Sequence, residues 1–446
     1  MVYIRRNLDK VLLSWKNDPD RKPLLVRGAR QVGKTSTIEQ LGSHFEQFVV
    51  VNFEKNRQLR SLFEGDLDVK EICMKLSVHF KKPIEPQKTL LFFDEIQSCP
   101  KAIASMRYFY EDFPDLHMVA AGSLLEFALE ELPTFGVGRI DSLFMYPFSF
   151  QEFMLASGEE LLWNEVCKSS PEIPLFPLFH EKCIDLLKKY LIIGGMPAAV
   201  YSFLKNNDIL KVQRVLDRLI LSLQNDFAKY KKRLPMLLLR EVFASIVKQA
   251  GGKFIYSKAA ETSHYNIKQA INLLILAGLV IPVVSSSANG IPLGAEANHK
   301  NCKMLLLDTG IFQRLLDLQI SDIINSGDFE AVNKGAIAEQ FAGLEIIKNS
   351  SPYVPENLYF WMREQKKSQA EVDYLIQYNG KIVPIEVKSG KSGKMQSLHL
   401  FLSEKQSEYG IRTSLENFTK YNNIRVYPLY AIGNIKAVTQ NTPYPQ

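Results

Sequence analysis

Four short apolar runs divide the first third of the chain, and stretches with helical spacing lie between them. The runs are 23–26, 48–53, 89–93 and 116–121. They are nearly continuous in apolar residues rather than alternating, a pattern typical of strands that are buried on both faces of a parallel sheet. We therefore expect an α/β core over residues 1–157.

The middle of the chain has a different pattern. Helical spacing dominates residues 158–235 and is interrupted at Gly194 and Gly195, which a proline follows closely. Because glycine and proline end helices, we interpret the interruption as a structural turn. Three short helical patterns and an apolar ribbon then predict a winged helix over 236–290. Winged helices contact DNA or serve as protein-interaction modules, and both alternatives stay open.

The last region, 291–446, contains a strong hairpin signal. Asn379-Gly380 lies between two runs of alternating polar and apolar residues, so a two-residue type I′ turn is expected. Counting outward from this turn sets Asp373 opposite Glu386 and Glu371 opposite Lys388, all on one face of the hairpin. The residues expected to fill the other face are Val372, Tyr374, Ile376, Val383, Ile385 and Val387.

The facing carboxylates of this hairpin predict a cation between them. Two like charges directly opposite each other repel. A Mg²⁺-dependent phosphodiesterase requires such a pair, with Asp373 and Glu386 as metal ligands and Lys388 beside the attacking water or the scissile phosphate. The alternative is a carboxylate set that is balanced by Lys388 and other lysines and serves only for docking.

The most specific motif, G-x-x-x-x-G-K-T, directly follows the first apolar run. The motif predicts a phosphate loop, in which the backbone N–H groups surround a polyphosphate, Lys34 reaches the β- and γ-phosphates and Thr35 ligates Mg²⁺. The residues expected to bind the nucleotide are Gly28, Ala29, Arg30, Gln31, Val32, Gly33, Lys34, Thr35 and Ser36.

Polar residues follow the third and fourth apolar runs. Asp94 and Glu95 end the third run, and Ser123 follows the fourth, at the edge of a parallel sheet where ligands bind. We expect Asp94 to hold Mg²⁺ through water, Glu95 to polarise the attacking water, and Ser123 to orient this water or sense the γ-phosphate. The alternatives are capping roles before the helices that follow, and Ser123 can serve in both ways.

These motifs, together with Gly138-Arg139 and the run 146–153, resemble the prokaryotic AAA+ ATPase family that carries an uncharacterised C-terminal domain. The resemblance covers almost the whole chain and implies an AAA+ fold, ATP with Mg²⁺ as the cofactors, and a helical lid over 158–235. It makes Arg139 a candidate for the arginine that contacts the γ-phosphate, in its own chain or in a neighbouring subunit of a homo-oligomer. A surface arginine is the alternative.

Asp373, Glu386 and Lys388 resemble the core of a PD-(D/E)xK nuclease, and Glu339, in a helical stretch, matches the helix-borne acid of that core. Val372 precedes Asp373 where the motif has proline, which is a departure. The resemblance implies a restriction-endonuclease-like α/β domain in the last region, with Glu339 as a further metal ligand.

Composition limits the remaining possibilities. A net charge of +6 and a pI near 8.8 permit a nucleic-acid partner without requiring one. The five cysteines are scattered without a C-x-x-C pair, which argues against a zinc ribbon or a disulfide framework. No apolar run reaches the roughly 18 residues that a spanning helix needs. We therefore expect a cytoplasmic protein with no membrane partner.

Two functions of different classes are consistent with this sequence. The first is an ATP-driven AAA+ motor or switch whose C-terminal domain binds or cuts DNA or another nucleic acid. The second is a non-cleaving, ATP-dependent regulator or adaptor whose C-terminal domain only docks a protein or a nucleic acid.

Overall fold

The computed structural model describes residues 3–65, 67–131, 138–230, 234–316, 334–363, 370–390 and 393–435. The chain forms two compact units. The N-terminal unit comprises Met1–Pro147, Leu276–Gly278 and Ser351–Pro355, and the C-terminal unit comprises Phe148–Ile275, Leu279–Ser350 and Glu356–Gln446. The four-domain division at residues 157, 235 and 290 stays a prediction.

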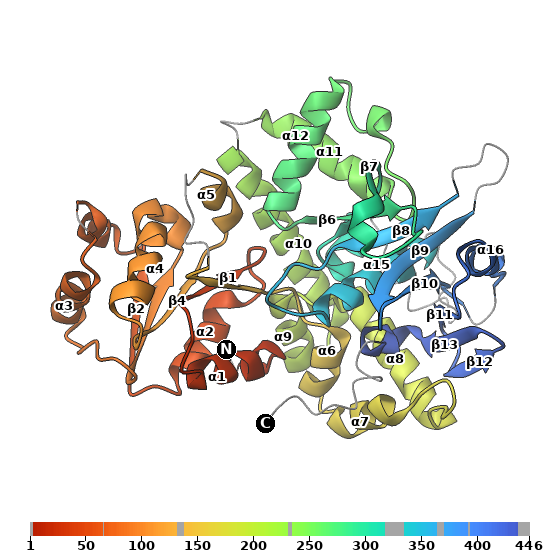
Figure 1. The fold of residues 1–446 in the computed structure, drawn as a ribbon, viewed down its shortest axis with the longest axis horizontal. Helices are drawn as coiled ribbons and strands as arrows, with labels where there is room; N and C mark the ends of the chain where they lie inside the picture. Colours follow the sequence, from red (N-terminus) through yellow and green to blue (C-terminus); the bar gives the residue numbers. More distant parts are fainter. Residues whose placement is uncertain are drawn as a thin grey trace. The chain divides into compact units, whose positions relative to one another are not determined.

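The N-terminal unit contains a five-stranded parallel sheet with the order β2-β3-β4-β1-β5 (Figure 1). Its strands are β1 (Leu24–Arg27), β2 (Gln47–Asn52), β3 (Thr89–Asp94), β4 (His117–Ala121) and β5 (Asp141–Phe144). Its helices are α1 (Leu8–Asn17), α2 (Lys34–Gly42), α3 (Val69–Phe80), α4 (Pro100–Asp112) and α5 (Leu125–Glu131). The predicted parallel α/β core is therefore confirmed.

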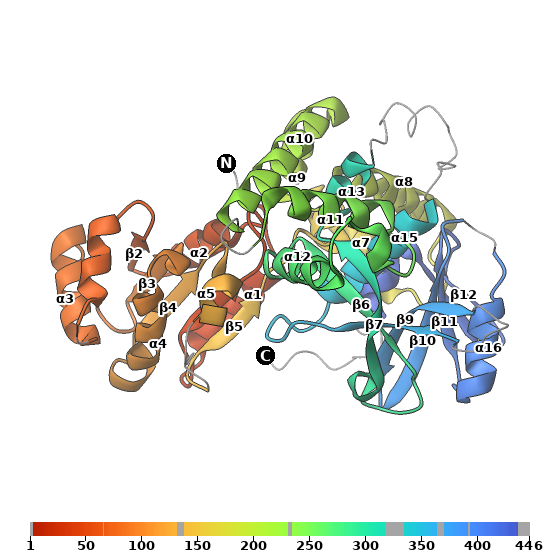
Figure 2. The ribbon, with the colours of Figure 1, turned by 90° about the horizontal axis from the view of Figure 1, so that it is seen from above.

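The continuous apolar runs have the burial that their pattern predicts. Every residue of β3 and of β4 is buried, because helices cover both faces of the sheet (Figure 2). One face packs against α3, α4 and α5 through a core that includes Phe93, Met106 and Leu125. The two strands end beside each other at Asp94 and Ala121, so the polar residues that follow them share one sheet edge.

The C-terminal unit contains an eight-stranded mixed sheet with the order β12-β13-β11-β10-β9-β8-β6-β7. Its strands are β6 (Val280–Ser286), β7 (Ala297–Leu306), β8 (Leu358–Met362), β9 (Glu371–Tyr378), β10 (Lys381–Val387), β11 (Gly410–Ser414), β12 (Thr419–Tyr421) and β13 (Ile424–Pro428). Its helices are α6 (Phe150–Ala156), α7 (Glu160–Lys168), α8 (Pro177–Ile193), α9 (Pro197–Asn206), α10 (Ile209–Asn225), α11 (Met236–Lys248), α12 (His264–Leu276), α13 (Thr309–Leu315), α15 (Lys334–Lys348) and α16 (Gln396–Lys405).

The apolar ribbon of the expected winged helix is part of this larger sheet. β6 pairs antiparallel with β7 on one side and parallel with β8 on the other. The helices α11 and α12 are present, with a short 3-10 turn between them at Tyr256–Lys258. The ribbon is therefore continuous with the strands that carry the carboxylates, and the winged helix as a separate domain stays a prediction.

Gly194 and Gly195 form the structural turn that their sequence indicates. Gly194 ends α8 with a φ of +73°, and a Cβ built on it would lie 2.2 Å from Asp308 Oδ1. A Cβ on Gly195 would lie 2.1 Å from the Phe148 carbonyl oxygen. Neither position has room for a side chain.

The predicted register of the β9–β10 hairpin is confirmed. Both central residues of its turn have positive φ, 48° and 73°, as a type I′ turn requires. The strands pair from Lys381↔Tyr378 to Ile385↔Tyr374. Asp373 and Glu386 come next in this register, but the backbone pairing ends before them.

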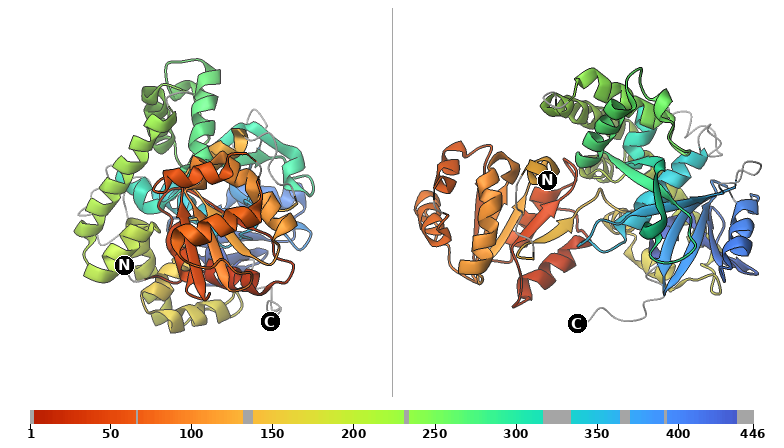
Figure 3. Two further views of the ribbon diagram at one scale, coloured as in Figure 1. Left: turned by 90° about the vertical axis from the view of Figure 1, so that its left-hand side faces the viewer. Right: turned by 45° about the horizontal axis from the view of Figure 1, so that its top comes forward.

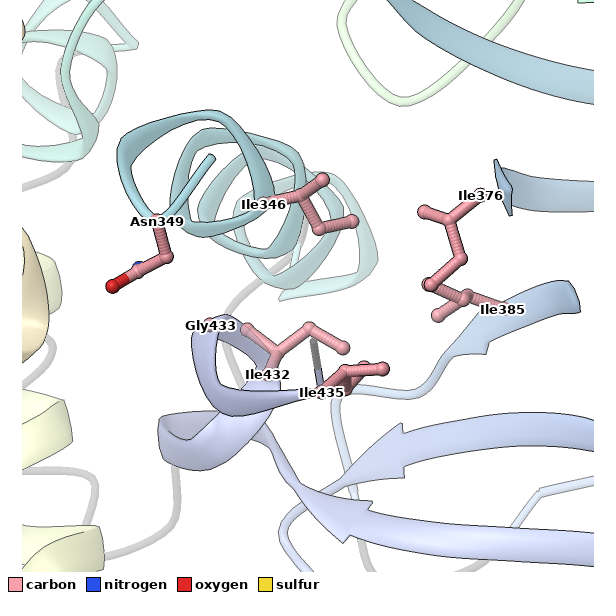
Figure 4. Close-up of a pocket in the computed structure, with 7 residues that line it drawn as sticks. All are labelled: Ile346, Asn349, Ile376, Ile385, Ile432, Gly433 and Ile435. Atoms are coloured by element: carbon pink, nitrogen blue, oxygen red, sulfur yellow. The ribbon is translucent and has the colours of Figure 1, made fainter. Parts of the chain in front are cut away.

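The expectation that Val372 and Ile376 share one apolar face is wrong. Val372 packs with Trp361 in a cluster that includes α16, whereas Ile376 lines an apolar hollow beside α15 (Figure 4). These helices cover opposite faces of the hairpin (Figure 3). The cause is a bulge, since Trp361 pairs with Val372 but Tyr359 pairs with Leu375. One extra residue in β9 interrupts the alternation of side chains.

Two further sequence expectations concern cysteines and membranes. All five cysteines are free, and four of them are buried. Among the residues that the structure describes, no helix is both long enough and apolar enough to cross a bilayer.

Candidate functional site

The loop between β1 and α2 requires glycine at two positions. Gly28 has a φ of 141° and Gly33 a φ of 103°, both in the left-handed region. A Cβ built on Gly28 would also lie 2.2 Å from the Met145 carbonyl oxygen. A loop that curls in this way at the start of a helix directs backbone N–H groups towards one point, the arrangement that binds phosphate oxygens.

The other loop residues differ in exposure. Ala29 and Val32 are buried, whereas Gln31 and Ser36 are exposed. Ser36 Oγ donates a hydrogen bond of 2.9 Å to the Gly33 carbonyl oxygen, so this hydroxyl supports the loop itself. The buried pair can contribute to a ligand only through the backbone.

Arg6 holds the loop in place, and sequence reasoning missed it. Its guanidinium donates to the Val32 carbonyl oxygen at 3.0 Å and to the Tyr146 carbonyl oxygen at 2.6 Å. Arg6 is buried, which strengthens hydrogen bonds made by a charged group. Its only sequence signal is a charged residue shortly before the first helix, and this signal is common.

Lys34, the first residue of α2, is 7% exposed. Its Nζ donates to the carbonyl oxygens of Gly28 and Ala29, both at 2.8 Å. Within the described residues, no carboxylate reaches it at ion-pair distance. Burial lowers the pKa of Lys34 to about 8, although Glu95 and Asp94 act in the opposite direction. The ammonium group is therefore enclosed but not neutralised by a direct partner.

Asp94 and Thr35 are brought together as the motif predicts. Thr35 Oγ1 donates to Asp94 Oδ1 at 3.2 Å, and Asn52 Nδ2 donates to Asp94 Oδ2 at 2.8 Å. Burial raises the pKa of Asp94, and the neighbouring Glu95 raises it further. A hydroxyl beside a carboxylate at the end of a phosphate loop is the donor set that holds Mg²⁺ in P-loop proteins. The residues present therefore fit a magnesium ion.

Asn52 was not predicted as a site residue. It ends β2 and lies in register with Asp94 across the β2–β3 pair. A polar residue at the end of an apolar strand was the available signal. That β2 lies next to β3, and Asn52 therefore next to Asp94, does not follow from the sequence without the strand order.

Glu95 has a backbone conformation that is unusual for a residue with a side chain. Its φ is 51° and its ψ 43°, in the left-handed region where strain costs about 1–3 kcal/mol and is often found at functional sites. Glu95 Oε2 accepts from Ser123 Oγ at 3.0 Å and from Gln97 Nε2 at 2.7 Å. The structure thus joins two predicted residues, Glu95 and Ser123, and adds Gln97.

Within the described parts of the chain, Arg139 has no hydrogen bond or ion pair with the residues of the phosphate loop or with Glu95. It forms an ion pair with Glu111 of α4 and is partly exposed. Arg27, which directly precedes Gly28, was not predicted. Its Nε donates to Glu126 Oε1 at 2.7 Å, and its guanidinium lies 4.7 Å from the centre of the Phe144 ring.

The second candidate region is the carboxylate cluster, which we define as Glu339, Glu371, Asp373 and Glu386. Glu339 and Glu386 are buried. Lys388, also predicted here, pairs with Glu386 Oε1 at 2.6 Å. Burial is the largest cause that raises the pKa values of Glu339 and Glu386 to about 7.

A second cation in this cluster is a lysine that sequence reasoning missed. Lys303 of β7 is 1% exposed, and its Nζ lies 2.8 Å from Glu339 Oε1 and 3.5 Å from Asp373 Oδ1. It also pairs with Glu371. Burial alone would lower the pKa of Lys303, but the three carboxylates together raise it. A lysine within the apolar run 302–307 was the available signal.

The expected role of Glu339, Asp373 and Glu386 as metal ligands stays a prediction. In the described ranges, no group of three or more histidine, cysteine or acidic side chains is placed to hold one metal ion. Glu339, Asp373 and Glu386 therefore do not converge as three ligands. Asp373 Oδ2 instead accepts from the Val387 backbone N–H at 2.8 Å.

The glycine-rich loop, the enclosed Lys34 and the Thr35–Asp94–Glu95–Ser123 arrangement define a P-loop nucleotide-binding domain. Family models support this class. Residues 20–154 match the model of an AAA domain, and two further matches are domains of unknown function, DUF8612 over 184–322 and DUF4143 over 334–432. These matches support an AAA-like ATPase domain in the first part of the chain and give no activity for the remainder.

No curated protein matches the chain. One solved structure, the Walker-type ATPase PABY2304 of Pyrococcus abyssi, has 14% identity and a TM-score of 0.45, and the match covers 70% of this chain and 96% of that one. Protein VC1899 from Vibrio cholerae has 9% identity and a TM-score of 0.19, with coverage of 93% and 95%. At these scores, neither likeness establishes a shared fold.

Proposed function

We propose that the N-terminal unit binds ATP with Mg²⁺ and hydrolyses it. The observation that carries this proposal is the position of Glu95, held by Ser123 next to the Thr35–Asp94 pair. A carboxylate in this place can accept a proton from an attacking water, because it is oriented and close to the expected γ-phosphate. A bound Mg²⁺ would supply positive charge against the phosphate oxygens.

Each side chain has a definite task in this proposal. Lys34 donates to the phosphate oxygens in place of the two carbonyl oxygens that it now contacts. Thr35 and Asp94 hold the magnesium ion, and Asn52 orients Asp94. Ser123 orients Glu95 by donating a hydrogen bond to its carboxylate, and this hydrogen bond changes when Glu95 takes up a proton. The buried, uncompensated charge of Lys34 favours an anionic ligand, since such a ligand restores the stabilisation that the ammonium lost on leaving water.

Calorimetric titration of the full chain with ATP and Mg²⁺ tests this proposal. Wild-type protein should bind ATP, and Lys34→Ala should abolish measurable binding. Lys70→Ala, an exposed lysine on α3, is the matched control for the change of charge and should bind ATP as the wild type does. Wild-type protein without measurable affinity for ATP would overturn the proposal.

A second candidate function is nucleic-acid contact by the C-terminal unit. Tyr265, at the start of α12, is 69% exposed, and Lys258 and Lys268 are exposed near it. An exposed aromatic ring between lysines can stack on a base while the ammonium groups contact phosphates. The alternative is that these residues dock a protein.

Gel retardation at increasing salt distinguishes the alternatives. Binding to nucleic acid should weaken steeply as salt rises, and Lys258→Ala with Lys268→Ala should reduce both the affinity and the salt dependence. Lys70→Ala again serves as the control. If no DNA or RNA is retarded at low salt, the adaptor function with a protein partner is favoured.

A further inference from the structure

Lys303 is surrounded by its own chain. It lies on β7, and its three carboxylate partners come from α15 and β9. The ring of Phe360 on β8 lies 5.2 Å from Nζ. A buried ammonium is stable only when opposite charges and hydrogen bonds replace its hydration. These contacts provide that replacement, so Lys303 is a component of the cluster rather than a residue beside it.

The cluster oxygens are spaced for an ammonium group. Lys303 Nζ lies 2.8 Å from Glu339 Oε1 and 3.5 Å from Asp373 Oδ1, whereas Mg²⁺ needs oxygens at about 2.0–2.1 Å. The second oxygen of Asp373 accepts the Val387 N–H, and Lys388 contacts Glu386 Oε1. Most of the oxygens that a metal would use therefore have a nitrogen partner already.

We propose that Lys303, through its contacts with Glu339, Glu371 and Asp373, is the built-in counterion of the carboxylate cluster and takes the role that a divalent metal ion has in a nuclease with these carboxylates. The Asp373–Glu386–Lys388 set is then held together without metal, and the C-terminal unit does not cut nucleic acid by metal-dependent chemistry. This inference is independent of the ATPase proposal, because it concerns only residues of the C-terminal unit.

One carboxylate oxygen of the cluster has no hydrogen-bond partner among the described residues. Four carboxylates face two lysines, so negative charge remains in excess. Glu386 Oε2 is buried, and no described residue donates a hydrogen bond to it. If any part of the cluster still accepts a divalent cation, this oxygen is the place where it would bind.

The experiment measures Mn²⁺ binding by electron paramagnetic resonance in the full chain. Every sample carries Asp94→Asn, which removes the proposed metal ligand of the nucleotide site. We expect no saturable Mn²⁺ binding in this background. Adding Lys303→Met should create one site, because the methionine side chain has no charge and ends one atom short of Nζ, which leaves the position of the ammonium group free. Lys348→Met, which removes another buried lysine of the same unit, is the matched control and should create none.

Two results would overturn the inference. The first is saturable Mn²⁺ binding, or Mn²⁺-dependent plasmid cleavage, that is present with Lys303 in place and lost in Asp373→Asn. The second is a folded Lys303→Met protein that gains no Mn²⁺ site. If Lys303→Met does not fold, the double variant with Glu339→Gln replaces it. This variant has less uncompensated charge, and the same gain of Mn²⁺ binding is expected from it.

Discussion

Lys34 and Lys303 are both buried, but their surroundings are opposite. Lys34 donates only to main-chain carbonyl oxygens of its own loop, and burial lowers its pKa to about 8. Lys303 contacts three carboxylates, which raise its pKa. A buried lysine without a direct countercharge favours the binding of an anionic ligand, whereas the charge of a lysine with carboxylate partners is already compensated. In our proposals, lysine therefore binds an anionic ligand in one unit and serves as a built-in counterion in the other.

The backbone shows the same contrast. Glu95 and Gln31, which we propose to lie in the nucleotide site, both have positive φ. In the C-terminal cluster, Asp373 lies at the bulge of β9 and Glu386 on β10, and among the described residues of this hairpin positive φ values occur only in its turn. Strain at functional residues persists because the surrounding structure imposes it. Its presence beside Lys34 and absence beside Lys303 agree with one ligand site and one structural cluster.

The largest expected effect is on catalysis at the open site. Glu95→Gln should reduce ATP turnover by about 10³-fold, because general-base catalysis contributes about 10²–10⁴. ATP affinity should stay within about 3-fold, since the carboxylate does not hold the phosphates. Phosphate release under single-turnover conditions and calorimetry measure the two quantities. Glu85→Gln, an exposed glutamate, is the control. Equal turnover in Glu95→Gln and the wild type would contradict the assignment.

A smaller effect is expected at Asn52, which donates a hydrogen bond to Asp94. Asn52→Ala should weaken the apparent Mg²⁺ affinity during ATP hydrolysis by about 10-fold, since groups that orient metal ligands contribute about 10–100-fold. Turnover at saturating Mg²⁺ should recover, which a general loss of folding would not allow. Failure to recover at high Mg²⁺ would show that Asn52 has another role.

His117 extends the comparison to a third buried basic side chain. Its Nε2 contacts the Lys16 carbonyl oxygen at 2.9 Å, and burial lowers its pKa to about 4. The pKa of His117 in the folded state lies below the unfolded value of about 6.5. The unfolded state therefore binds a proton first as the pH falls. The stability that the neutral, buried imidazole maintains is fully present above pH 6.5 and is lost as the pH falls towards 4. After allowance for solvent screening, the loss should be about 1 kcal/mol. The unfolding free energies of wild type and His117→Gln, measured by denaturant titration, should converge as the pH falls. A difference between them that stays constant with pH would contradict this account.

The smallest effect is expected at Arg139. Because it pairs with Glu111 at a partly exposed position, Arg139→Ala should change turnover by less than about 2-fold, as is common for surface ion pairs. Steady-state ATPase assays over a range of protein concentrations measure this. A loss of about 10³-fold, the size typical of an arginine that contacts the γ-phosphate, would favour that role, and a dependence on protein concentration would favour a role in a neighbouring subunit.

Local features of the sequence were sufficient for part of this structure. The spacing from Gly28 to Thr35 and the apolar runs predicted the phosphate loop and the parallel sheet, because both depend on neighbouring residues. The Asn379-Gly380 turn predicted the hairpin register for the same reason. The conformation of these elements is determined mainly by residues that are close in the sequence.

Features that depend on distant strands were not predictable. Lys303 reaches the cluster because β7 and β9 belong to one sheet, and nothing in the residues around it indicates that arrangement. Asn52 required the order of the parallel strands. The side-chain direction of Val372 depends on a bulge opposite β8, which alternating polarity cannot show. A single sequence therefore identified the carboxylates and Lys388 but not Lys303, the buried cation that three of the carboxylates contact.

The most direct test of the comparison is a pair of denaturant titrations, Lys34→Met and Lys303→Met, each with and without ATP and Mg²⁺. Lys303→Met should lose about 3–5 kcal/mol of unfolding free energy, because it leaves buried carboxylates without their partner, and should keep the wild-type stabilisation by ATP. Lys34→Met should stay within about 1 kcal/mol of the wild type without ligand, since its hydrogen bonds are to backbone carbonyls, and should gain nothing from ATP. Equal destabilisation by the two substitutions, with the ATP effect retained in both, would contradict the account.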